Sequence, residues 1–144
     1  IELFDTAHDD KFRHLSYPKT DVFIVSYSIE SQSSFENVKT IWVPEINYHL
    51  PNTPFILVGM KEDLRNDKES IVKLWQHNQT PVSHAMGSKL AKELKAAKFC
   101  ECSSLTTKGI TNAFDEAILS TFVSVNLKST FCQRLIPCSS KRFF

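Results

Sequence analysis

Two apolar stretches decide the fold of this chain: VFIVSY at Val22–Tyr27 and PFILVG at Pro54–Gly59. Their apolar residues are nearly continuous, whereas a strand with one solvated face would alternate apolar and polar residues. Continuous runs of this length are typical of strands that are buried on both faces of a parallel sheet. A weaker stretch, Lys98–Cys102, predicts a third strand.

Helical patterns lie between and after these stretches. Apolar residues at three- and four-residue spacing predict helices over 34–48, 68–77, 83–97 and 110–123. Pro44 lies inside the first of these helices and should kink it. After Val125 the periodicity stops, and we expect a mostly disordered tail over 126–144. Alternating strands and helices predict right-handed crossovers and an α/β fold.

Length and composition indicate one globular domain. The chain has 144 residues, of which 42% are apolar and 23% charged, with a formal net charge of +1. This balance favours neither nucleic acid nor an anionic membrane as a partner, and no apolar run is long enough for a transmembrane helix. The four cysteines, Cys100, Cys102, Cys132 and Cys138, have no zinc-site spacing, and we expect reduced thiols in a cytoplasmic protein.

Polar segments follow the predicted strands where a ligand would bind. In open α/β sheets, ligands bind in the crevice beyond the carboxyl ends of the strands. The start of the chain looks like a strand, and Asp5-Thr6-Ala7 follows it. Met60–Arg65 follows the second buried strand, and Cys102–Leu105 follows the last. Three such loops in this order predict a nucleotide site.

These segments resemble motifs of the Rho-family small GTPases. Asp5-Thr6-Ala7 resembles the start of the D-T-A-G motif, and Lys61-Glu62-Asp63 resembles the end of the guanine motif N/T-K/Q-x-D. Glu101–Thr106 is similar to the Rho-family E-C-S-A-L-T. Three further segments resemble the Rac-like branch: Leu15–Pro18, Trp42–Ile46 and Phe114–Ile118. The resemblance covers about residues 1–123, and the region 66–80 matches the position of the Rho-type helical insert.

The resemblance implies a partial G domain over residues 1–125, with the three-layer, mostly parallel architecture of phosphate-loop NTPases. It implies a GTP-binding molecular switch in signal transduction and actin cytoskeleton regulation, with GTP or GDP and Mg²⁺ as cofactors. Rho-type effectors, exchange factors or protein kinases would be its partners. Two alternatives stay open, namely a non-catalytic module that binds Rho effectors or regulators, and a non-functional degenerate copy.

Site residues carry over from the matching motifs. Asp63 would accept hydrogen bonds from guanine N1 and N2, and the stem of Lys61 would lie on the purine face. The Ser103-Ser104 loop would point a backbone N–H at guanine O6, and Leu105 would cover an edge of the base. Asp5 would hold Mg²⁺ through water. The switch II segment would comprise Thr6, Ala7, His8, Asp9 and Asp10.

The chain also departs from the family pattern. It contains only three glycines and no G-x-x-x-x-G-K-S/T loop, so the phosphate cradle is absent from these residues. The chain also lacks the Gly and the Gln that follow D-T-A. A straight reading puts His8 and Asp9 there, whereas an alignment backwards from Leu15 places a gap on both.

Four expectations follow from these departures. The chain is N-terminally truncated and lacks the first strands and first helix of the G domain. It does not hydrolyse GTP, and its nucleotide binding is weak or absent. Cys138 is seventh from the end, where prenylation needs a Cys fourth from the end, so we expect no prenyl anchor. Stable membrane association is therefore not expected.

Overall fold

The computed structural model describes residues 2–5 and 13–135. Its strands form one parallel sheet in the order β1-β2-β3, with bounds Phe23–Ser28, Phe55–Met60 and Lys98–Cys102. The strands predicted at 22–27, 54–59 and 98–102 are confirmed to within one residue. β2 is buried along almost its whole length, as expected for a central strand covered on both faces.

The first crossover is one helical stretch with a distortion in its middle. It consists of α1 (Gln32–Asn37), a π-helical turn (Val38–Trp42) and α2 (Val43–His49). The N–H of Val43 donates to the carbonyl of Val38, five residues back. Pro44 has no N–H to continue the ordinary ladder, so the distortion expected at this proline takes the form of a π turn.

The remaining helices begin at polar caps or at glycine. Asp67 accepts a hydrogen bond from the Ser70 N–H at the start of α3 (Lys68–Gln76), and Ser83 does the same for Met86 at the start of α4 (His84–Glu93). α5 (Ile110–Leu135) follows Gly109. Short 3-10 helices lie at Arg13–Ser16 and Glu62–Asn66.

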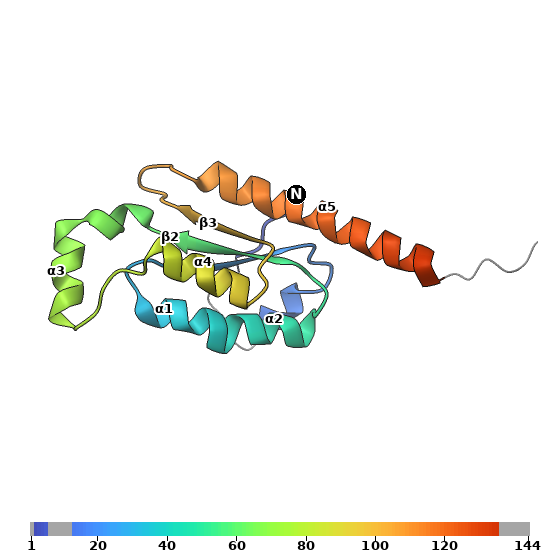
Figure 1. Ribbon diagram of the computed structural model, residues 1–144, viewed down its shortest axis with the longest axis horizontal. Coiled ribbons are helices and arrows are strands. Elements are labelled where there is room, and N and C mark those ends of the chain that lie inside the picture. Colours follow the sequence, from blue (N-terminus) through green and yellow to red (C-terminus); the bar gives the residue numbers. More distant parts are fainter. Residues whose placement is uncertain (1, 6–12, 136–144) are drawn as a thin grey trace, which may run out of the picture.

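Helices cover both faces of the sheet, giving three layers (Figure 1). On one face, α1, α2 and α4 bury a core that includes Tyr27, Val38 and Leu57. On the other face, α5 packs Ala113 and Ala117 against β2 and β3. α3 stands apart at the end of the molecule toward which the strands point. Within the described residues, no helix is both long and apolar enough to cross a membrane.

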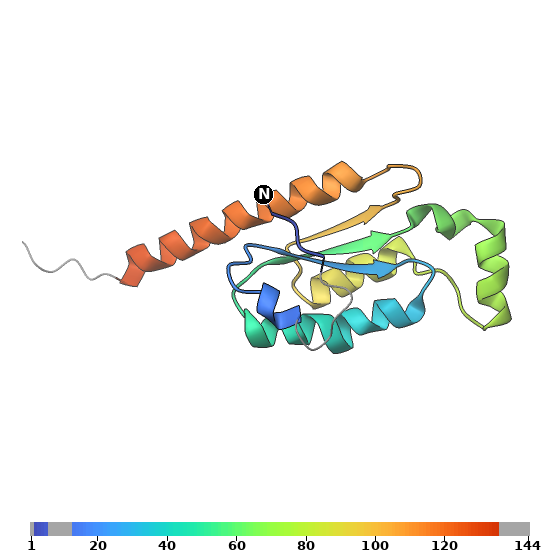
Figure 2. The same ribbon diagram turned by 180° about the vertical axis from the view of Figure 1, so that it is seen from behind.

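Two sequence-based predictions need correction. The tail was expected to begin at residue 126, but α5 continues to Leu135, because residues 110–135 contain neither Gly nor Pro and Pro137 is the first residue that opposes a helix. Residues 2–5 were expected to belong to a strand, but they have no regular structure, and Figure 2 draws them as an irregular chain. A strand needs a hydrogen-bonding neighbour, and the three-stranded sheet of the described residues does not include this segment.

Candidate functional site

The loops after the three strands begin at one edge of the sheet. Ser28 at the end of β1 is paired with Met60 at the end of β2, and Met60 is paired with Cys102 at the end of β3. The next residues along the chain therefore start side by side, and the strands all point toward the end of the molecule that carries α3 (Figures 1 and 2). This edge is where an open α/β sheet binds ligands.

Ion pairs tie the second loop to its neighbours on both sides. Lys61 lies in the left-handed region at φ 61°, and its ammonium forms an ion pair with Glu30 in the loop after β1. One residue further on, Glu62 pairs with Lys108 in the loop after β3, at 2.7 Å between Oε1 and Nζ. The three loops are thus linked in a row across the edge of the sheet.

Arg65 anchors the far end of the same loop. Its guanidinium donates to both carboxylate oxygens of Glu101, at 2.9 and 2.5 Å, and to the carbonyl oxygen of Val82. The hydrogen bonds to Glu101 hold the pKa of Arg65 above its ordinary value, although burial works in the opposite direction. This bidentate pair fixes the loop onto β3.

Asp63 lies at the centre of this pinned loop. Lys61, Glu62 and Arg65 are all ion-paired, whereas no residue of the described chain provides a hydrogen bond or ion pair to the Asp63 side chain. Its carboxylate is therefore available to a ligand, and the pinned neighbours limit the movement of the backbone that carries it. A carboxylate held in this way can accept two parallel N–H bonds.

The three predicted site residues in the loop after β3 differ in their exposure to solvent. Ser103 is fully buried, its backbone N–H donates to the carbonyl of Lys108, and its Oγ accepts from the N–H of Thr106. The N–H and Oγ of Ser103 are therefore used in hydrogen bonds within the loop and stabilise its shape. Ser104 and Leu105 are exposed, and the Leu105 side chain keeps 81% of its surface in solvent. Of the three predicted base-contacting residues in this loop, only Ser104 and Leu105 are thus exposed to solvent.

Gly109 closes the same loop. Its φ of +74° lies in the region that L side chains rarely adopt, and a Cβ here would lie 2.2 Å from the carbonyl oxygen of Glu101. A side chain would therefore push the start of α5 away from β3.

The structure describes only one of the residues predicted to lie near Mg²⁺ and the phosphates, namely Asp5. Asp5 ends the described N-terminal segment, is exposed and is engaged within the protein. Thr6, Ala7, His8, Asp9 and Asp10 lie outside the described residues. Downstream of them, Arg13 and the Tyr17 hydroxyl both bond to Glu45 on α2, at 3.0 and 2.5 Å. Burial works to raise the pKa of Glu45, but these hydrogen bonds and the charge of Arg13 together hold it below its ordinary value.

Residues 1–122 match the Ras family. The chain belongs to the Ras family of small GTPases. The α/β fold inferred from the apolar stretches is confirmed, and the three-stranded parallel sheet with its helices is consistent with a partial Ras-like domain. Ras-family proteins in general bind GTP with Mg²⁺.

The residues present suit the guanine base of GTP better than its triphosphate and Mg²⁺. Asp63, the Lys61 stem and the Ser104 loop offer the groups that a guanine base requires. The 144 residues contain no phosphate loop, and within ranges 2–5 and 13–135 no group of three His, Cys, Asp or Glu could hold a metal ion. The described residues therefore offer groups that suit a base, whereas no phosphate-binding loop accompanies them in the 144 residues.

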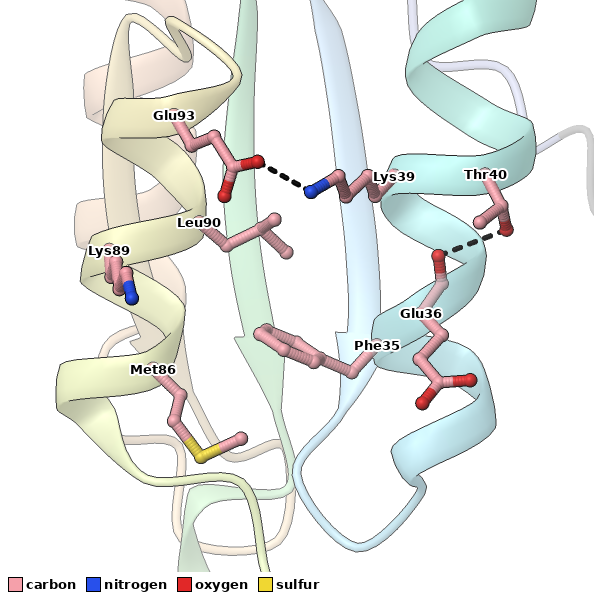
Figure 3. A pocket seen from close by; sticks show the side chains of 8 residues that line it. All are labelled: Phe35, Glu36, Lys39, Thr40, Met86, Lys89, Leu90 and Glu93. Atoms are coloured by element: carbon pink, nitrogen blue, oxygen red, sulfur yellow. Dashed lines mark hydrogen bonds and ion pairs between the residues drawn. The ribbon is translucent and has the colours of Figure 1, made fainter.

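Sequence reasoning missed two features of this Ras-family chain. Glu30 belongs to none of the motifs, and only its position just after a strand could have drawn attention to it. A groove of about 390 Å³ lies between α4 and the helical stretch of α1, with Phe35, Met86 and Leu90 as apolar lining and a Lys39–Glu93 ion pair across it (Figure 3). It opens between two helices, away from the loops that carry Asp63.

Proposed function

We propose that this chain is a Rho-type small GTPase whose retained chemistry is recognition of the guanine base, and that residues 1–144 by themselves do not hydrolyse GTP. The Asp63 carboxylate carries this proposal, because it has no hydrogen-bond or ion-pair partner among the described residues, whereas Lys61, Glu62 and Arg65 in the same loop are ion-paired. Guanine offers the N1 and N2 donors side by side, and adenine cannot provide that pair. One bidentate contact of this kind discriminates between bases by about 1–3 kcal/mol.

The surrounding residues complete the base site. The methylene stem of Lys61 offers an apolar face for the purine, and its left-handed backbone sets the direction in which that stem leaves the loop. Ser104 provides a backbone N–H for guanine O6, and Leu105 covers an edge of the ring. When bound, GTP would supply the charged phosphates on which a switch depends, and Mg²⁺ would neutralise part of their charge. The residues named here would contact only the base.

Affinity should be low, because base contacts amount to a few hydrogen bonds and one covered face. We expect dissociation constants in the millimolar range or weaker, which is about −4 kcal/mol or less favourable. Amide chemical shifts of the chain should be titrated with guanosine and, separately, with adenosine. Residues 61–65 and 103–105 should respond to guanosine more strongly.

The Asp63→Asn variant tests the assignment. An amide presents a donor where the carboxylate accepts, so this variant should lose the preference for guanosine over adenosine. Glu69→Gln, on exposed α3 outside the loops, is the matched control and should keep it. Equal responses to the two nucleosides in the unchanged chain would refute base recognition.

A second function is favoured by α3, the helix in the insert position. None of its residues is buried, and Val72 and Trp75 expose 52% and 64% of their surface. An amphipathic helix with an uncovered apolar face suits a Rho-type effector or regulator. The Asp63→Asn variant separates the two functions, because it should remove guanine recognition and leave binding through α3 unchanged.

A further inference from the structure

We propose that Glu30 is a specificity-determining residue of the base site. By pairing with Lys61, it makes the site favour uncharged guanosine over the phosphorylated forms of guanosine. This inference rests on the proposed function and adds to it the charge of the preferred ligand.

Glu30 is held on rigid backbone. The preceding residue, Ile29, is fully buried, its N–H donates to the carbonyl of Met60, and its own carbonyl accepts from Val82. The following residue, Ser31, donates its N–H to the carbonyl of Ser28. The backbone of Glu30 is therefore held beside the start of the Lys61 loop, and its carboxylate pairs there with the Lys61 ammonium.

In the described loops at this edge of the sheet, every basic side chain has an acidic partner. In the described segments that follow the strands, residues 29–31, 61–67 and 103–109, the basic side chains are Lys61, Arg65 and Lys108. Each has a carboxylate partner, namely Glu30, Glu101 and Glu62 respectively. After pairing, the carboxylates of these segments without a basic partner are Asp63 and Asp67, which caps α3.

This arrangement acts on the phosphates more than on the base. Guanosine is neutral and needs only Asp63 as acceptor, the Lys61 stem and the loop N–H. A phosphate on the same nucleoside is attached through the ribose at N9, on the side of the purine opposite the edge that Asp63 reads. It would find the Lys61 ammonium already paired with Glu30, so its approach is disfavoured. Glu30 thus neutralises the Lys61 ammonium and leaves the methylene stem of Lys61 available to the base.

Glu30→Gln tests the idea because it keeps the shape of the side chain and frees the Lys61 ammonium. The probes are guanosine, GTP and inorganic triphosphate, titrated without metal and followed at the amides of residues 61–65. In the unchanged chain, guanosine should bind at least as tightly as GTP, and triphosphate should leave these amides unmoved. In Glu30→Gln, the ratio of the two affinities should move toward GTP by about two- to fivefold, the effect of one exposed ion pair, and triphosphate should perturb Lys61.

Two controls sharpen the result. Glu93→Gln breaks another exposed ion pair, with Lys39, at the end of α4 that leads toward the start of β3, and should leave the ratio unchanged. The shift caused by Glu30→Gln should also shrink at high salt, because exposed charges are screened. Guanosine binding with an unaltered ratio in Glu30→Gln would overturn this inference alone. A chain that does not bind guanosine would overturn the proposed function and this inference with it.

Discussion

At the scale of single residues, Tyr27 is the largest of the fully buried side chains among the described residues. Its side chain is 1% exposed and its ring meets that of Phe35 edge-on, with centroids 5.0 Å apart. The hydroxyl has no hydrogen-bond partner in the part of the chain that the structure describes. Burial raises the pKa of Tyr27 above its ordinary value, and the charge of Glu101 adds to this. A Cβ on Gly87 would lie 2.4 Å from the Tyr27 hydroxyl oxygen.

Two substitutions test this packing. Tyr27→Phe should raise the free energy of unfolding by about 1 kcal/mol, because a buried hydroxyl without a partner costs desolvation energy. Gly87→Ala should lower it by about 1–3 kcal/mol through overpacking, even though the same change in an open helix would be favourable. Urea unfolding followed by Trp42 and Trp75 fluorescence measures both. A Tyr27→Phe variant less stable than the unchanged chain would show that the hydroxyl is satisfied.

At the scale of elements, β1 is one of the two edge strands of the sheet that the described residues form. The N–H groups of Phe23 and Ile29 point to Pro54 and Met60 on the β2 side, so the alternating residue Ile24 directs its backbone groups to the other side. Among the described residues no strand pairs with that side. The Ile24 side chain is 37% exposed, on the face where α5 covers β2 and β3. Open edges of this kind invite pairing with other chains.

Ile24→Lys should therefore reduce concentration-dependent association without a large loss of stability, because Lys on an edge strand opposes pairing. Static light scattering over a range of protein concentrations is the measurement. Val72→Lys on exposed α3 is the matched control, since it adds the same charge away from the edge. Association that persists in Ile24→Lys and disappears in Val72→Lys would place the self-association surface on α3.

At the scale of the whole molecule, the phosphate-handling parts of a Ras-family switch are absent from the 144 residues. Without a phosphate loop and without the Gln after Asp5-Thr6-Ala7, nothing in these residues positions a γ-phosphate or an attacking water. Single-turnover assays with labelled GTP should therefore show no hydrolysis, with or without a Rho-directed activating protein. An intact Rho-family GTPase serves as control, and a rate for this chain near about 10⁻⁴ s⁻¹, typical of slow intrinsic hydrolysis, would contradict the prediction.

The local sequence by itself determined the elements and the candidate base readers. Continuous apolar runs require two buried faces, which is why the strands at 23–28 and 55–60 could be read from pattern alone. Lys61 and Asp63 were predicted from the resemblance of Lys61-Glu62-Asp63, which follows such a strand, to the guanine motif of small GTPases. The continuation of α5 to Leu135 was not predicted, because the apolar periodicity that marks a packed helix stops after Val125.

Only the tertiary structure decided which of these groups are free to act. Lys61 meets Glu30, Arg65 meets Glu101, and the Ser103 N–H is used by Lys108. The two ion pairs join residues on different strands or loops, so they depend on strand register and on the direction of each loop, which no local pattern contains. The same holds for residues 2–5, whose apolar composition suggested a strand, because a strand exists only where a neighbour accepts its hydrogen bonds.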